Sequence, residues 1–151
     1  MKQLQDYINE KLHISRYRKQ EYNYHPKTKD ELKDLVDKLI KKRGNKADLN
    51  DIDTSNIDDM SWMFSSSKFN GDISSWNVSN VKNMRCMFEY SKFNKDISQW
   101  DVSNVVNMMS MFCNSHFAQD ISSWNVSNVK NFMRMFQFCP LEKNPPSWYK
   151  E

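Results

Sequence analysis

With 151 residues, 38% of them hydrophobic, the chain is long enough for one compact domain or one short array of stacked repeats, and too short for several large domains. The net charge of +3 is unevenly distributed. Residues 1–47 hold 13 Lys and Arg and 7 Asp and Glu, a net charge of +6, whereas residues 48–151 hold 9 Lys and Arg and 12 Asp and Glu, a net charge of −3. No apolar run is long enough for a signal peptide or a membrane span, so the sequence argues against an integral membrane protein and predicts a cytoplasmic location.

The first predicted element is a short amphipathic helix over residues 2–12, where apolar side chains recur at helical spacings at Leu4, Tyr7, Ile8 and Leu12. A basic, tyrosine-rich stretch then continues to Pro26 without any period and is expected to be an extended arm. Two interpretations of residues 1–26 stay open: the helix packs on the next segment, or it is a docking peptide that orders on a partner. The basic charge is typical of a solvated surface, or of a segment that contacts acidic partners such as nucleic acid.

The second predicted element is a helix over residues 28–43 with both ends marked in the sequence. Thr28 is suited to be its N-cap, and Glu31 three residues later completes a capping box. Gly44 follows a basic last turn and is expected to end the helix in the left-handed conformation. The apolar stripe of this helix must be buried, so residues 27–47 are predicted to cap the repeats that follow.

Residues 48–139 repeat with a constant step of 24 residues. The step is clearest in four tryptophans and four phenylalanines: Trp76, Trp100, Trp124, Trp148, Phe64, Phe88, Phe112 and Phe136. A fixed period in this range is typical of stacked repeats, in which each copy buries its apolar side chains on its neighbours. Prolines at 140, 145 and 146 interrupt the pattern, so residues 140–151 are predicted to form a C-terminal cap.

Each copy is predicted to hold one strand and one short helix. In the second copy Ile73, Trp76 and Val78 belong to a short extended stretch, and apolar residues then follow at i, i+3, i+6 and i+7 over 81–88, as on one helix face. A strand and a helix within 24 residues are typical of a leucine-rich repeat, and the crossover rule for parallel strands favours a right-handed connection. The predicted fold class is therefore α/β: a right-handed leucine-rich-repeat-like solenoid of four to five turns with an N-terminal helical cap.

The polar residues that recur in each copy could form a functional site, or they could only stabilise the turns of the repeat. The aspartates would stack in a column at Asp48, Asp72, Asp96 and Asp120, which indicates either a ladder of cations or side-chain capping of local turn amides. Three cysteines without a CxxC spacing fall in three different columns, as expected for reduced structural thiols. The three histidines have no partner at metal-binding spacing, and no nucleophile elbow occurs. We therefore expect no enzyme activity, no metal and no cofactor.

The repeat motif resembles that of a known family. From Phe69 onward the chain follows the string Phe-Asn-x-Asp-Ile-Ser-x-Trp-Asn/Asp-Val-Ser-Asn-Val-x-Asn-Met-x-x-Met-Phe, which resembles the BspA-like leucine-rich repeats of mycoplasma and other bacterial surface proteins, found also in gut-bacterial and phage genomes. The resemblance covers roughly residues 28–139. It implies a solenoid with binding or adhesion roles and no catalytic residues. Because no signal peptide, lipobox cysteine or anchor is seen, we expect an intracellular bacterial or phage-encoded binder, with a cell-surface adhesin as the alternative.

Columns that vary between copies mark the expected solvent face. They place aromatic side chains such as Tyr90 and Phe138 next to cations, a combination typical of interface centres, although free drift at exposed positions would give the same variation. The sequence thus predicts a monomeric protein-binding module whose partner is another protein, with nucleic-acid binding through the basic N-terminal segment as an alternative. The candidate partner-binding residues are Tyr7, Ile8, Leu12, Arg16, Arg18, Lys19, Lys82, Arg85, Tyr90, Lys92, His116, Lys130, Arg134 and Phe138.

Overall fold

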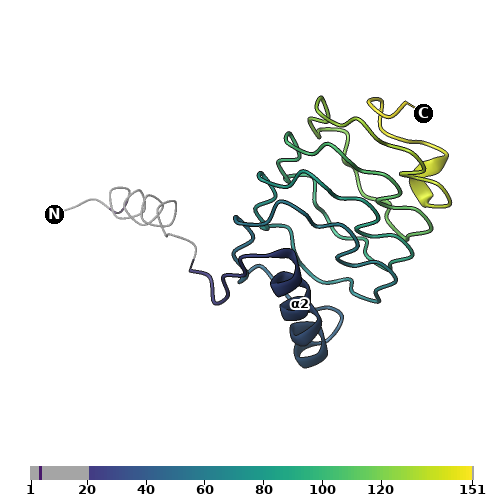
Figure 1. Cartoon of the computed structure of the whole chain (residues 1–151). Coiled ribbons are helices and arrows are strands. Elements are labelled where there is room, and N and C mark those ends of the chain that lie inside the picture. Colours follow the sequence, from purple (N-terminus) through teal and green to yellow (C-terminus); the bar gives the residue numbers. More distant parts are fainter. Residues whose placement is uncertain (1–3, 5–20, 151) are drawn as a thin grey trace.

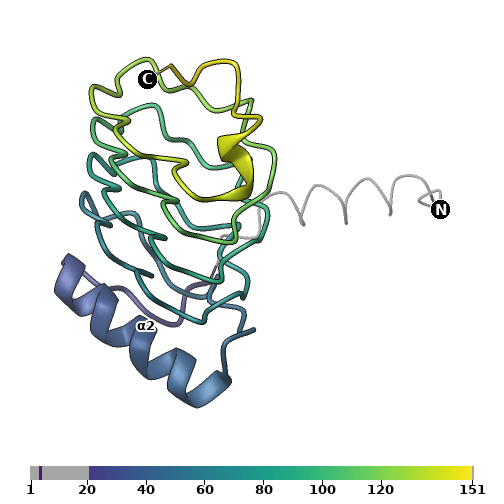
Figure 2. The ribbon, with the colours of Figure 1, turned by 90° about the vertical axis from the view of Figure 1, so that its right-hand side faces the viewer.

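The computed structural model describes residue 4 and residues 21–150. Its helical elements within residues 21–150 are α2 (Lys29–Arg43) and the 3-10 helix η1 (Pro140–Glu142). After α2 the backbone winds in successive loops that lie on one another, with α2 across one end of the array and η1 near the other (Figures 1 and 2). The helix expected over residues 2–12 lies, apart from Leu4, outside the described residues.

The predicted α/β fold is wrong. The described part of the chain contains no named β-strand and no sheet, only isolated parallel bridges. The expected strand around Ile73 is instead a tight turn, in which the Trp76 amide donates to the Ile73 carbonyl at 3.1 Å. The expected helix is absent too, and its segment carries the bridge from Asn83 to Asn107. A right-handed leucine-rich-repeat solenoid of alternating strand and helix is therefore not what these repeats form.

The 24-residue segments nevertheless lie on one another. We call residues 48–71, 72–95, 96–119 and 120–143 the four coils, and their assembly the stack. Each coil is joined to the next by backbone hydrogen bonds that recur at the sequence step: Trp62 N to Arg85 O at 3.0 Å, Cys86 N to Met109 O at 2.9 Å and Ser110 N to Met133 O at 2.9 Å. Within a coil the intervening amides close tight turns, as Met63 N does on Met60 O at 3.3 Å.

Equivalent phenylalanines stack inside the coils and form the centre of the core. The rings of Phe64 and Phe88 are nearly parallel, with centroids 5.5 Å apart, and the pair Phe88–Phe112 repeats this arrangement at 5.6 Å. All four phenylalanines of this column, including Phe136, are at most 1% exposed. Stacking at these separations adds specific ring contacts to the burial of apolar area, so the phenylalanine column holds neighbouring coils in register.

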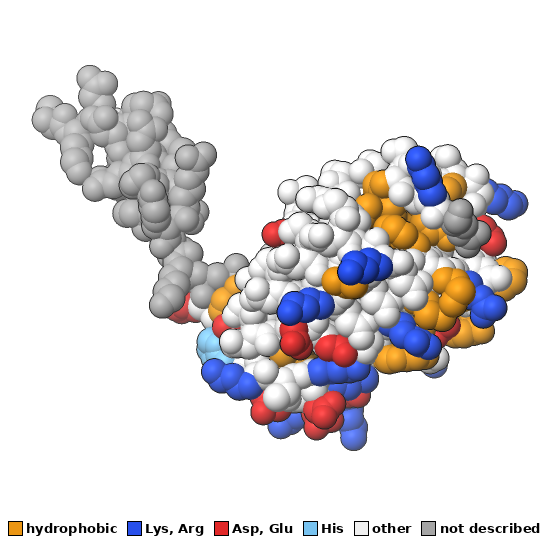
Figure 3. Space-filling model, turned by 45° about the horizontal axis from the view of Figure 1, so that its top comes forward, with side chains coloured by type: hydrophobic (Ala, Val, Ile, Leu, Met, Phe, Trp, Pro, Cys, Tyr) orange, Lys and Arg blue, Asp and Glu red, His pale blue; other side chains and the backbone are white. Residues whose placement is uncertain are grey.

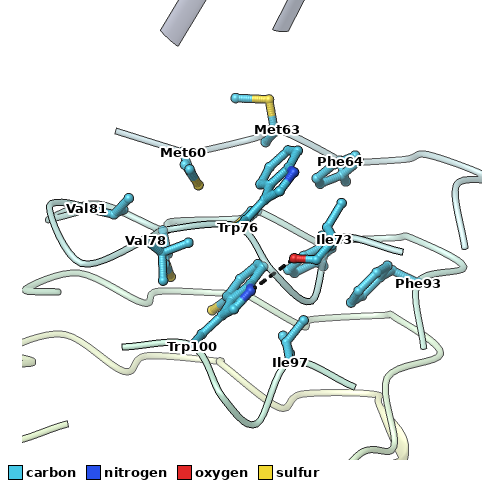
Figure 4. Close-up of a cluster of buried hydrophobic side chains, with 14 of the residues drawn as sticks. Met60, Met63, Phe64, Ile73, Trp76, Val78, Val81, Phe93, Ile97 and Trp100 are labelled. Atoms are coloured by element: carbon cyan, nitrogen blue, oxygen red, sulfur yellow. Dashed lines mark hydrogen bonds between the residues drawn. The ribbon is translucent and has the colours of Figure 1, made fainter. Parts of the chain in front are cut away.

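The tryptophan column links the coils through side-chain hydrogen bonds. The indole N–H of Trp100 donates to the Ile73 carbonyl of the preceding coil at 3.2 Å, and Trp76 and Trp124 make the same bond to Leu49 and Ile97 (Figure 4). These three indoles are at most 4% exposed, so each bond satisfies a buried donor and a buried carbonyl at once.

Helix α2 begins where the sequence indicates. The Thr28 hydroxyl accepts from the Glu31 amide at 3.2 Å, and the Glu31 carboxylate accepts from the Lys27 amide at 2.6 Å. Leu32 lies on its buried face, together with Val36 and Leu39. Gly44 ends the helix with φ 90° and ψ 170°, so its φ is positive as expected but its ψ is not that of the left-handed helical conformation.

Residues 21–26 lie along the first coil and join it to the end of α2. Tyr24 forms a parallel bridge with Ile52, and its carbonyl accepts from the Asp53 amide at 2.8 Å. The Arg43 guanidinium donates to both carboxylate oxygens of Asp51 at 2.9 Å. This charged hydrogen bond from Arg43 lowers the pKa of Asp51 to about 2.

Candidate interaction surface

One side of the stack is built from the tight-turn segments of the four coils. These segments span residues 58–66, 82–90, 106–114 and 130–138, and parallel bridges hold them side by side through Asp59, Asn83, Asn107 and Asn131. Because the bridged segments lie on one another, their outward side chains share one side of the stack. We call this side the turn surface.

The backbone of the turn surface is unusual for residues that carry a β-carbon. Eight non-glycine residues have a φ between 54° and 63°, and they fall in two columns: Trp62, Cys86, Ser110, Arg134 and Ser66, Tyr90, Asn114, Phe138. A left-handed conformation costs a side-chain-bearing residue roughly 1–2 kcal/mol, and glycine is the usual choice there. The chain has only two glycines, neither of them in these columns.

Large hydrophobic side chains are exposed on the turn surface. Exposed fractions are 66% for Phe138, 59% for Tyr90, 52% for Met133, 46% for Trp62 and 37% for Val106. Outside these segments, the only other large hydrophobic side chain exposed in the described part of the chain is Leu4. An exposed apolar set that gathers on one side of a protein marks an interaction site more often than scattered residues do.

Cations lie among these apolar side chains. The guanidinium carbon of Arg85 lies 5.8 Å from the centre of the Trp62 ring, a cation–π contact between adjacent coils. Lys82, Lys130 and Arg134 are also exposed on the same segments. In Figure 3 hydrophobic side chains alternate with Lys and Arg over the C-terminal part of the molecule. Aromatic and cationic groups side by side are the combination that protein interfaces favour.

The structure places the sequence-predicted residues in two groups. All eight that belong to the repeats are exposed: Lys82, Arg85, Tyr90, Lys92, His116, Lys130, Arg134 and Phe138. The Lys92 ammonium lies 2.9 Å from the Nε2 atom of His116, so these two residues of adjacent coils form a pair beside the turn surface. The other six lie outside the described residues: Tyr7, Ile8, Leu12, Arg16, Arg18 and Lys19.

The list of candidate residues left out three members of the turn surface, Trp62, Val106 and Met133, although the varying columns of Val106 and Met133 were expected on the solvent face. A signal for Trp62 was available, because it shares a column with Cys86 and Ser110 and is the only aromatic residue there. Val106 and Met133 stand in varying columns, but their apolar character resembles that of the core columns. The structure shows both side chains exposed.

The aspartate column caps turns. The Asp72 carboxylate accepts from the Ser74 amide at 2.9 Å, and Asp96 and Asp120 accept in the same way from the residue two positions on. Hydrogen bonds from that amide and from the serine side chain lower the pKa of each of these aspartates. Of the two readings of the column, local capping therefore accounts for its geometry.

In the described part of the chain, the cysteine thiols and the potential metal ligands are not grouped into a reactive or metal-binding site. The thiols of Cys86, Cys113 and Cys139 are buried and free, and burial raises the pKa of each. Within the described residues no three His, Cys, Asp or Glu side chains are grouped so that they could hold a metal ion. No helix over the same residues is long and apolar enough to cross a membrane.

Comparison with protein families finds a match over most of the chain. The model of a family described as a Mycoplasma protein of unknown function, DUF285, matches residues 31–148. The chain belongs to the DUF285 family. The match begins inside α2 and ends at Trp148, so it covers most of α2 and all four coils of this DUF285 chain. No curated protein and no solved structure matches the chain.

Proposed function

We propose that the chain is a non-enzymatic protein-binding module and that the turn surface is where it binds another protein. The observation that carries this proposal is the exposure of Tyr90 and Phe138 in a left-handed backbone. Both residues stay mostly exposed, and each occupies a conformation that asparagine or glycine would adopt at lower cost. Strained residues whose side chains gain little burial are common at functional sites.

The chemistry of the surface indicates a partner with apolar and acidic groups. Rings at Trp62, Tyr90 and Phe138 offer rigid contact area, and Arg85 already uses its guanidinium against one of them. Exposed Lys82 and Lys130 add positive charge that would steer an acidic protein towards this side. Such a surface favours a protein partner over a small molecule, which would need an enclosed and largely apolar pocket.

Within this proposal we assign the repeats to the BspA-like group, on the recurring motif that begins at Phe69. An intracellular bacterial or phage-encoded binder remains our preferred role, and a cell-surface adhesin would use the same turn surface. Finding the native protein in the envelope fraction of its source cell would favour the adhesin.

The test removes rings without disturbing the backbone. Tyr90→Gly and Phe138→Gly each delete an aromatic side chain at a left-handed position, where glycine is the least strained residue. Asn114→Gly is the matched control, because it makes the same backbone change in the same column without removing a ring. The immobilised wild-type protein is used to purify a partner from the source cell, and the affinity of each variant for that purified partner is then measured by calorimetry.

We expect the two aromatic deletions to weaken binding by about tenfold or more each, since rings at interface centres contribute about 1–2 kcal/mol or more. Asn114→Gly should bind like the wild type. Equal affinity of all three variants would exclude the turn surface. A captured partner that disappears on nuclease treatment would replace the proposal with nucleic-acid binding.

A further inference from the structure

The apolar side chains of the turn surface form a band that crosses all four coils. Its members are Trp62 from the first coil, Tyr90 from the second, Val106 and Met109 from the third, and Met133 and Phe138 from the fourth. Met109 is half-buried, and the other five are exposed. We call these six side chains the apolar band. Because the bridged segments lie side by side, a partner that covers the band must lie along the stack rather than along one coil.

Basic side chains border the apolar band on both sides. Along the chain, one border comes at the start of each turn segment, and the other comes two residues after its end. The first border holds Lys82 and Lys130, and the second holds Lys68, Lys92 and His116, all of them exposed. The Lys92 ammonium lies 2.9 Å from Nε2 of His116, so the second border continues from one coil to the next. The column of the first border also holds Asp58 in the first coil and Val106 in the third, so its positive charge lies over the second and fourth coils.

The step between coils matches one turn of an α-helix. Ring centroids of equivalent phenylalanines lie 5.5 Å apart for Phe64–Phe88, 5.6 Å for Phe88–Phe112 and 6.0 Å for Phe112–Phe136. An α-helix rises about 5.4 Å per turn, so side chains on one helix face recur at nearly the same interval. Side chains on one side of an extended strand recur only about every 6.4–6.8 Å. A helix along the stack can therefore present one apolar side chain to each coil.

The backbone of the turn segments is bonded from coil to coil. The Trp62 amide donates to the Arg85 carbonyl at 3.0 Å, and the Cys86 amide donates to the Met109 carbonyl at 2.9 Å. An extended segment laid across the coils would lose water from its own amides and carbonyls without gaining partners for them. A helix pairs these groups internally, so burial on the apolar band favours a helical segment.

Two other occupants fit the apolar band less well. Nucleic acid binds through bases that stack on aromatic rings, whereas Val106, Met109 and Met133 are aliphatic. A second copy would have to offer a helix such as α2. That helix already buries its apolar face at Leu32, Val36 and Leu39, and it carries six Lys and Arg against four Asp and Glu.

We infer that the turn surface binds an acidic amphipathic helix that lies along the stack, with its apolar face on the apolar band and its carboxylates on the basic borders. The inference rests on the proposed function and names the kind of segment that the protein partner presents. Apolar contact supplies the centre of such an interface, and the cations on both sides select carboxylates and set the position of the helix.

The probe is an end-blocked peptide of about 16 residues, with leucine along one helical face and glutamate on both sides of that face, which spans about 24 Å as a helix. It is titrated into the full ¹⁵N-labelled chain. We expect saturable shifts of the Trp62 indole resonance and of the Met109 and Met133 amides, which belong to three different coils. A scrambled peptide of the same composition, without an apolar face, should give no saturable shift. A peptide with proline at its centre should bind about tenfold more weakly, because proline breaks the helix.

Charge reversal tests the two borders separately. Lys82→Glu/Lys130→Glu changes the first border and Lys92→Glu the second, and each should weaken binding of the probe about tenfold, because attraction becomes repulsion. Lys95→Glu is the matched control and should bind like the wild type. Lys95 is an exposed lysine of the same coil as Lys92, and it lies outside the turn segments and their borders.

Several outcomes would overturn the inference. Equal binding of the scrambled peptide, or an unmoved Trp62 indole in a well-dispersed spectrum, would exclude the helix site. Equal binding of the proline peptide would indicate an extended segment, and a loss with Lys95→Glu as large as that with Lys92→Glu would indicate general charge attraction. Tighter binding of a hexathymidylate oligonucleotide, or a dimer of the free chain that the probe dissociates, would assign the band to nucleic acid or to a second copy.

Failure of the proposed function would give a different result. In that case Tyr90→Gly and Phe138→Gly would keep their affinity for the purified partner. If those variants lose the partner while the helical probe fails to bind, the helix inference alone is wrong.

Discussion

Ser66, Tyr90, Asn114 and Phe138 share one backbone conformation and carry four unlike side chains. The conformation is imposed by the coil, because in the first three coils the amide of this residue donates to the next coil, whatever the side chain is. Asparagine tolerates a left-handed φ better than serine or an aromatic residue does. Since folding sets the backbone at this position and leaves the side chain unburied, the column can change its chemistry without changing the fold.

Replacing Ser66 by glycine should stabilise the protein. Glycine removes a left-handed penalty of roughly 1–2 kcal/mol and adds an entropic cost of roughly 0.5–1 kcal/mol, so we expect a net gain of about 0.5–1 kcal/mol. Urea unfolding followed by tryptophan fluorescence measures the change. Ser65→Gly is the control, because Ser65 is not among the residues with positive φ and should lose stability. A loss at both positions would contradict the argument from strain.

Acid should weaken the junction between Arg43 and Asp51. The pKa of Asp51 is lowered to about 2 in the folded protein from an ordinary value of 3.8, chiefly by the Arg43 hydrogen bond. A depressed pKa contributes stability that is fully present above about pH 4 and is lost as the pH falls from about 4 to about 2. We expect at most about 2 kcal/mol from this carboxylate, since both side chains keep some contact with water.

The measurement compares urea unfolding of the wild type and of Asp51→Asn at pH 6 and at pH 3. The variant should be less stable at pH 6, and the difference between the two proteins should narrow at pH 3. Other aspartates with lowered pKa values, Asp53 and Asp72 among them, will destabilise both proteins in acid. The informative quantity is therefore the difference between the proteins, and a constant difference would contradict the assignment.

At the scale of the element, α2 could be predicted from the sequence and the coil could not. The helix has its own local signals, since Thr28 and Glu31 pair within one turn and the apolar stripe has the helical period. The apolar residues from Val81 to Phe88 also show spacings of three, yet here the period comes from the corners of tight turns. A chain that bends every few residues buries the same positions as a helix does, and spacing alone cannot separate the two.

The cap formed by α2 should depend on its buried face. Leu32 is 0% exposed against the first coil, so Leu32→Ala should cost about 2–5 kcal/mol through lost burial and the cavity it leaves. Leu35→Ala is the control, because Leu35 is only partly buried and should lose less. Thermal unfolding by circular dichroism measures both variants. Equal losses at the two positions would show that α2 is not held by this face.

At the scale of the whole molecule, each coil packs on the coils next to it, and the stack has no single rounded core. Trp100 lies between two other coils and is 4% exposed, whereas Trp148 is half-buried at the end and still makes the indole bond to Ile121, at 3.1 Å. Trp100→Ala should therefore cost about 3–5 kcal/mol, a large part of the stability of a domain this size. Trp148→Ala should cost clearly less. Denaturant unfolding of the two variants gives the comparison, and equal costs would contradict an array of nearest-neighbour contacts.

The turn surface could be predicted from the sequence only in part. The repeat step and its varying columns pointed to Arg85 and Tyr90 without any structure, because core columns are held constant by packing. The left-handed backbone of Tyr90 could not be predicted in this way, because glycine or asparagine is the usual signal for that conformation and neither stands there.

The hydrogen bonds that alternate amides of the turn segments donate to the following coil also determine the order in which these amide protons exchange with solvent. The amides of Trp62, Cys86 and Ser110 are each protected by the coil that follows, so exchange requires that the C-terminal neighbour detach first. Opening from the end without the α2 cap therefore exposes Ser110 first, then Cys86 and finally Trp62, while α2 stays in place. Local opening free energies should rise in the reverse order of the sequence, so hydrogen–deuterium exchange would record the stack loosening one coil at a time from its C-terminus.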